Sequence, residues 1–205
     1  MKRILLPFAA GFVLLLSSCS DQPAATPVKK AEEKPEPVTG QTALFKMFQS
    51  ARSWDPRVQV LKLTSSHVTE VPEVRGKAAA WEGVFVSPTQ ARSKTFTYSV
   101  VELLPNLHKG VFGVAEEAYT APKRGPVPFL IEGAKIDTDK AYETALTKAT
   151  EYEKKNPGKV ITFILELDPR HPDPTWRVVW GESLSSSNFS VYVDATTGEF
   201  LEVMH

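Results

Sequence analysis

Hydrophobic positions recur at helical spacing in two segments of the chain. In residues 42–54 the apolar side chains fall three and four positions apart, at Leu44, Phe45, Met47, Phe48 and Ala51. Residues 138–155 show the same spacing, at Tyr142, Ala145, Leu146, Ala149 and Tyr152. This spacing places the side chains of each set on one face of a helix. The pattern therefore predicts two amphipathic helices, each with one face turned toward a core.

Both predicted helices carry stop signals, and the second carries a start signal. The first is expected to end at Asp55, because a residue that precedes a proline disfavours helical geometry. The second is expected to begin at Asp137 or Thr138, whose side chains can accept N–H groups of a first turn. Its sequence ends in the Asn-Pro-Gly run of residues 156–158, which stops a helix.

Strand-like sequence follows each predicted helix. Short runs rich in β-branched and aromatic residues, bounded by Ser, Gly and Pro, are typical of strands. The predicted strands are residues 58–63, 79–86 and 95–103 after the first helix, and 160–167, 175–181 and 188–193 after the second. Trp81 leads to Phe96 in the first set as Trp176 leads to Phe189 in the second. We interpret this as a duplicated helix–strand–strand–strand unit.

The remaining segments complete an α+β fold, with an antiparallel sheet packed on helices. Residues 107–119 are expected to form a further strand or pair, and 129–131 a short strand that enters the second helix. Residues 194–198 fit a tight turn that ends in glycine, and 199–203 a returning strand. The first unit then spans residues 41–128 and the second 129–205.

The N-terminal segment predicts export and lipid attachment. Lys2 and Arg3 precede an apolar run over residues 4–16 that is shorter than the roughly 20 residues needed to span a bilayer. Leu16-Ser17-Ser18-Cys19 resembles the bacterial lipobox, in which the peptide is cut before the cysteine and the thiol is acylated. We expect a signal peptide over residues 1–18, cleavage between Ser18 and Cys19, and stable anchoring of Cys19 to a membrane by two or three acyl chains.

A tether is expected to follow the anchor. Residues 19–40 hold the lipidated cysteine and then a run rich in Pro, Lys and Glu, with few large apolar side chains. Such a composition cannot bury enough surface to offset the entropy of ordering, so the segment is predicted to be disordered. Ser20 favours the outer membrane over the inner, which would place the folded part in the periplasm of the bacterial cell envelope.

Composition excludes some classes of protein. The 205 residues carry 24 basic and 24 acidic side chains, so the formal net charge of zero gives no footprint for nucleic acid. The one cysteine excludes an internal disulfide. The sequence has no P-loop, no Gly-x-Ser-x-Gly and no His-Glu-x-x-His motif. We therefore predict no enzyme activity, no catalytic residues, no cofactor and no metal.

Two groups of residues could carry binding chemistry. Trp81, Trp176, Trp180 and Tyr192 could form an aromatic face that stacks on a ligand, although packing against a helix is the simpler interpretation. Asp168, His171 and Asp173 could ligate a metal ion. Three prolines within residues 168–174 instead favour a rigid turn between strands.

The C-terminal part resembles a known family. Its Trp176-Arg-Val-Val-Trp strand, the run from Phe189 that closes in Val193-Asp-Ala-Thr-Thr-Gly-Glu, and the preceding helix with Ala141 and Ala145 are similar to a PepSY domain. The resemblance covers residues 135–202 and implies a small α+β unit, an antiparallel sheet on a helix, without catalytic residues. Residues 42–102 would be a diverged copy that lacks the Asp-Ala-Thr-Thr-Gly ending.

The resemblance implies a role outside the cytoplasm. PepSY domains occur in protease propeptides and in exported or anchored proteins, where they are thought to bind or restrain protein partners. We therefore expect a membrane-anchored, non-enzymatic protein or peptide-interaction module that restrains a secreted peptidase. The alternatives are a small-molecule or lipid-binding domain with an aromatic-lined concavity, a hydrolase whose site is assembled in space, and a structural component of the envelope.

Overall fold

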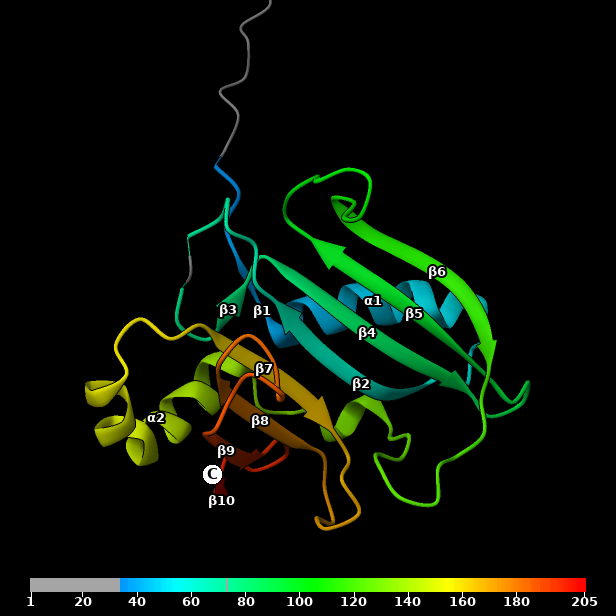
Figure 1. Cartoon of the computed structure of the whole chain (residues 1–205). Coiled ribbons are helices and arrows are strands. Elements are labelled where there is room, and N and C mark those ends of the chain that lie inside the picture. The colour runs from blue at the N-terminus through cyan, green and yellow to red at the C-terminus, as the bar shows by residue number, and fades with distance from the viewer. Residues whose placement is uncertain (1–33, 73) are drawn as a thin grey trace, which may run out of the picture. The chain divides into compact units, whose positions relative to one another are not determined.

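The fold follows from a computed structural model that describes residues 34–72 and 74–205. The predicted signal peptide, the cleavage site at Ser18 and Cys19, and tether residues up to 33 lie outside the described residues. Within them the chain forms helices on a large antiparallel sheet (Figure 1). The predicted α+β class, with an antiparallel sheet packed on helices, is confirmed.

The described part of the chain contains two α-helices, one short 3-10 helix and ten strands. In chain order they are β1 (Val38–Thr39), α1 (Gly40–Trp54), β2 (Gln59–Ser66), β3 (Lys77–Ala78), β4 (Ala80–Ser87), β5 (Arg92–Ser99), β6 (Gly110–Ala118), η1 (Ile131–Gly133), α2 (Thr138–Lys155), β7 (Ile161–Glu166), β8 (Thr175–Trp180), β9 (Ser190–Asp194) and β10 (Phe200–Met204). No helix among these described residues is long and apolar enough to cross a bilayer.

Eight of the strands form one continuous sheet. Their order is β10-β9-β8-β7-β2-β4-β5-β6, and every neighbouring pair is antiparallel. The centre is the β2–β7 pair, which divides the sheet into two halves of four strands: β7 to β10 on one side, and β2 with β4 to β6 on the other. Each half runs along the chain as a helix followed by these four strands, so the two halves have the same order of elements. β1 and β3 form a separate two-stranded ribbon.

The core lies between the helices and one face of the sheet. Because side chains alternate between the two faces of a strand, Leu63, Trp81, Leu165 and Trp176 all point to the helix side, and each is almost completely buried. The buried helix positions include Leu44 and Met47 of α1, with Ala141, Tyr142, Ala145 and Ala149 of α2. The alanines let the backbone of α2 approach the sheet closely.

The N-termini of the two helices meet beside the central strands. The Gly40 amide donates to Thr138 Oγ1 at 2.9 Å, and the Gln41 amide donates to Asp137 Oδ1 at 2.9 Å. Asp137 is also the N-cap of α2, where the same oxygen accepts the Thr138 amide at 2.7 Å. One carboxylate therefore serves the first turns of both helices.

Gly40 is required by this junction. A Cβ atom at that position would lie 2.7 Å from Thr138 Cγ2 and 2.7 Å from Cη2 of the Trp176 ring. The predicted tether also ends earlier than expected, because Val38 pairs with Ala78 and Gly40 begins α1. Disorder up to residue 40 was thus the wrong prediction for these last positions, which gain backbone partners from residues far along the sequence.

Three other predictions need correction. Phe45 is 48 % exposed, so it does not belong to the buried face of α1. The segment 129–131 is no strand: Phe129 makes one bridge to Val60, and a 3-10 turn follows at once. The predicted strand 95–103 ends at Ser99, since the chain leaves β5 there and Leu103 bridges to Leu107 instead.

Candidate functional site: a cleft between the central strands

The two halves of the sheet diverge along the β2–β7 pair. Only Lys62–Thr64 of β2 pair with Ile164–Glu166 of β7, although β2 continues to Ser66 and β7 begins at Ile161. Beyond Thr64 the ladder is replaced by one side-chain contact, in which the Phe163 amide donates to Ser65 Oγ at 2.9 Å. A cleft opens where the backbones separate.

The start of β7 presents a strand edge to this cleft. In an antiparallel strand, the backbone groups of every second residue point to the same side. Because the Phe163 amide points toward β2, the amide and carbonyl of Ile161 point to that side as well. The opposite side of β7 is paired with β8 from Ile161 to Glu166. The backbone of Ile161 is thus directed into the opening.

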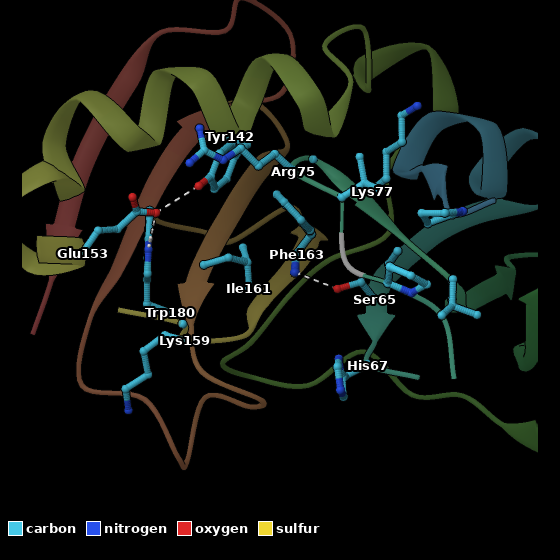
Figure 2. A pocket seen from close by; sticks show the side chains of 18 of the residues that line it. Ser65, His67, Arg75, Lys77, Tyr142, Glu153, Lys159, Ile161, Phe163 and Trp180 are labelled. Atoms are coloured by element: carbon cyan, nitrogen blue, oxygen red, sulfur yellow. Dashed lines mark hydrogen bonds between the residues drawn. The ribbon is translucent and has the colours of Figure 1, made fainter. Parts of the chain in front are cut away.

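The cleft encloses a cavity of about 560 Å³. Its walls are the end of β2, residues from the segments 67–72 and 74–79 with β3, α2 at Tyr142 and in its C-terminal half, the 156–159 turn, the start of β7, and Trp180 of β8. Figure 2 shows these side chains from close by. The apolar lining includes Val68, Val71, Ile161, Phe163 and Trp180.

A partly buried polar cluster closes the inner wall. Glu153 Oε1 accepts the Tyr142 hydroxyl at 2.9 Å and the Trp180 indole N–H at 3.1 Å (Figure 2). Burial, followed by the hydrogen bond and negative charge of Glu153, raises the pKa of Tyr142 to about 12. The Tyr142 hydroxyl therefore remains a donor at neutral pH. These partners fix the Glu153 carboxylate in the wall rather than leaving it to meet a ligand.

Among the described residues, the side chains at the mouth of the cleft are mainly basic. Arg75, Lys77, Lys154 and Lys159 are exposed and belong to the lining, whereas Glu153 is the one carboxylate among the described lining residues. Lys154 Nζ is paired with Glu151 Oε1 at 2.8 Å. Within residues 34–72 and 74–205, Lys77 and Lys159 form no ion pair. Positive charge at the rim is therefore available to an anionic partner.

The predicted aromatic binding face is not a surface. Trp81, Trp176, Trp180 and Tyr192 are each no more than 2 % exposed. The first two are fixed in the core, where Trp176 Nε1 donates to the Ile136 carbonyl at 2.8 Å and Trp81 Nε1 to that of Val38 at 3.3 Å. As a set of ligand-stacking residues this prediction is wrong, because helix packing covers the tryptophans. Only Trp180 lines the cleft.

Tyr192 lies on the opposite face of the sheet from these tryptophans. Its register partner is Arg177, whose guanidinium carbon lies 5.1 Å from the tyrosine ring centroid, and Arg170 lies 5.2 Å from the same centroid. Alternation along β9 separates Tyr192 from the core-facing Val191 and Val193. It therefore shares no site with the tryptophans.

Two of the three residues considered as metal ligands, Asp168 and His171, are engaged with other partners. Asp168 Oδ2 pairs with Arg170 at 2.9 Å, and His171 Nε2 lies 3.2 Å from Glu202 Oε1. Over the described residues, no group of three His, Cys, Asp or Glu side chains has the geometry of a metal site. The segment 168–174 instead forms a turn between β7 and β8, in which the His171 amide donates to the Asp168 carbonyl.

The cleft residues were not identified as a site from the sequence. Arg75 and Lys77 belong to a polar loop, and Lys159 follows a helix-ending turn, so nothing in their spacing links them. Their neighbourhood depends on the register between β2 and β7, which are about 100 positions apart in the chain. The strand edge at Ile161 arises because β7 separates from β2 there, and no local pattern in the sequence indicates where two distant strands separate.

The comparisons with known proteins identify the C-terminal half. Residues 135–204 match the model of the PepSY family, described as "Peptidase propeptide and YPEB domain". The match covers α2 and β7 to β10, and it supports the prediction of a PepSY domain in this half. No curated protein and no solved structure matches the chain.

Proposed function

We propose that this chain is a membrane-anchored, extracytoplasmic interaction module without catalytic activity, which binds a protein partner and restrains a secreted peptidase. The observation that carries the proposal is the match of residues 135–204 to a family of peptidase propeptides. A propeptide domain acts on its enzyme by occupying surface rather than by chemistry. The anchor at Cys19 would keep such a module at the membrane while its partner diffuses.

The geometry of the cleft supports a binding role. The hydroxyl of Ser65 accepts a backbone amide, and Glu153 accepts two donors within the wall, so both polar groups serve the fold. What the cleft offers to another molecule is a strand edge, an apolar floor and a basic rim. These are the features by which a domain captures a segment of another protein.

A capture experiment tests this function. The full chain, purified in mild detergent, is used as bait for an envelope extract of its own bacterium after chemical cross-linking, with an unrelated anchored protein as control bait. We expect it to retain a peptidase whose activity falls when the chain is added in excess. Retention of the same proteins by both baits, or of a peptidase that is fully active when bound, would contradict the proposal.

Anchoring is tested separately. Mass spectrometry of the chain isolated from membranes should find residues 1–18 removed and a diacylglyceryl thioether on Cys19. A chain that retains its N-terminal segment and a free thiol would contradict the proposed location, and it would leave the interaction role to be judged by the capture experiment.

One observation favours a second function. A cavity of about 560 Å³ between a sheet and a helix, lined by Phe163, Trp180 and Tyr142, falls in the size range of small-molecule sites. It fits the alternative of a small-molecule or lipid-binding envelope domain. This function would be favoured over the first if envelope metabolites quench the tryptophan fluorescence and the capture experiment retains no peptidase.

A further inference from the structure

We infer that the cleft between β2 and β7 binds an extended acidic peptide segment, which pairs with the β7 backbone and places an apolar side chain on the cleft floor. This inference rests on the proposed function, because it names the kind of partner segment that the module takes. Three independent features of the cleft lead to it: the direction of the backbone, the apolar lining and the charge of the rim.

The exposed backbone edge of β7 favours a partner in extended conformation. Between Ile161 and Phe163, one side of β7 is paired with β8 and the other faces the cleft. Ser65 Oγ takes the Phe163 amide, which leaves the amide and carbonyl of Ile161 directed at the opening. A peptide added as a strand satisfies such groups with its own backbone, whereas a helix has no backbone groups to offer along its side.

The floor calls for an apolar side chain. The apolar floor has a buried part, Phe163, Trp180 and Val71, each at most 3 % exposed. Ile161, which is partly exposed, and Val74, which is 45 % exposed, add accessible apolar surface. In an extended peptide, alternate side chains point to one face. One apolar residue of the bound segment would enter the cavity, and its two neighbours in sequence would point outward.

The rim calls for negative charge on both sides of that apolar residue. Lys77 comes from β3 and Lys159 from the turn before β7, and in Figure 2 they lie on different sides of the opening. Arg75 adds a third cation, and its positive charge acts on the Tyr142 hydroxyl in the wall. Carboxylates flanking the apolar residue would meet these cations, which sets specificity and association rate more than affinity.

The test uses an eight-residue peptide with a central phenylalanine, Asp and Glu on both sides, and a fluorescent dye at one end. Binding to the full chain is measured by fluorescence anisotropy at low and at physiological salt. We expect binding that weakens with salt, as exposed charge pairs do. The double variant Lys77→Glu with Lys159→Glu should bind at least about tenfold more weakly.

Matched controls separate the three features. Lys123→Glu with Arg124→Glu makes the same change of charge at two exposed positions between β6 and η1. The affinity of this variant should stay within about twofold of the parent. A peptide with Lys in place of every acid should not bind. A peptide methylated on every backbone nitrogen should lose binding, because it has no N–H on either edge to pair with a strand. Thermal unfolding confirms that each variant is folded.

Several results would overturn the inference. The inference fails if the basic peptide binds as tightly as the acidic peptide, or if the Lys77/Lys159 variant binds the acidic peptide as tightly as the parent chain. It also fails if the methylated peptide binds as tightly as the unmethylated one. Lysine-dependent binding to phosphatidylglycerol vesicles without binding of the peptide would identify a membrane surface as the partner instead.

If the double variant still captures and inhibits the peptidase, this inference fails while the proposed function stands. If the parent chain captures none, the proposed function fails.

Discussion

Asp55 fastens the C-terminal end of α1 to the β4–β5 hairpin. Its carboxylate accepts the hydroxyls of Ser87 and Thr89 and the backbone amide of Arg57, in a buried position. These donors, with Ser87 the strongest and Thr89 next, lower the pKa of Asp55 from 3.8 to about 2. Ser87 is itself fully buried, so water cannot replace the Asp55 carboxylate as the acceptor of its hydroxyl.

The lowered pKa predicts a pH dependence of stability. Because the folded state prefers the charged carboxylate, its contribution is complete above the unfolded pKa of 3.8 and is lost as pH falls toward about 2. We expect Asp55→Asn to weaken the dependence of the denaturation midpoint on pH in this window. Asp139→Asn, at an exposed carboxylate, serves as the control. A pH profile of Asp55→Asn that parallels the parent would contradict this role.

Single residues also show what sequence can and cannot predict. The two-residue alternation of strands correctly puts Trp176 and Trp180 on one face, but it does not say which face the helices cover. Tyr192, grouped with them by residue type, lies on the other face. Likewise Phe45 fits the helical period of α1, yet it is 48 % exposed because the period leaves the width of the buried stripe undetermined.

Among the elements, the junction of the two helices is the clearest case of mutual support. Asp137 Oδ1 accepts amides from both first turns, at 2.9 Å from Gln41 and 2.7 Å from Thr138. The sequence predicts Asp137 or Thr138 as the cap of α2 by residue type and position, and the structure assigns the role to Asp137. Its contact with α1 joins positions 96 apart, which no local pattern reveals.

Removing this shared cap should destabilise the fold. Asp137→Ala is expected to lower the free energy of unfolding by about 1–2 kcal/mol, the upper part of the range for a helix cap, because two turns lose an acceptor. Asp137→Asn, which retains an oxygen, should lose less. Glu143→Ala removes an exposed ion pair of α2 and should change stability by less than about 0.5 kcal/mol. Denaturant unfolding measures all three, and equal losses for Asp137→Ala and Glu143→Ala would contradict a shared cap.

The outer strand β6 shows why we place the binding site in the cleft rather than at this edge of the sheet. β6 is a long edge strand with Phe112 and Val114 each 45 % exposed. A register shift in its pairing with β5, and ion pairs from Glu116 to Arg92 and Lys94, interrupt the edge. Such irregularities and charges are the means by which proteins protect edges from further pairing. The cations beside the edge at Ile161, Lys77 and Lys159, form no ion pair among the described residues, so they disfavour a basic strand and attract an acidic one.

In the whole molecule, the two halves join through their first strands. The β2–β7 pair makes one sheet of two similarly ordered units, and the helix junction holds both N-termini on the same side. The sequence predicts both units, because hydrophobic period and turn residues are local. It does not predict β1, β3 or the cleft, each of which depends on pairing between distant segments. That dependence also explains why the site had no motif.

Site-specific photo-crosslinking tests the central claim most directly. A photoreactive phenylalanine analogue replaces Pro72, an exposed residue at the mouth of the cleft, in the full chain expressed in its own bacterium. The same replacement at the exposed Leu130, which is not part of the cleft lining, is the control. Light should join a defined secreted protein to position 72 and not to position 130. No adduct at position 72, or the same adducts at both positions, would contradict the account.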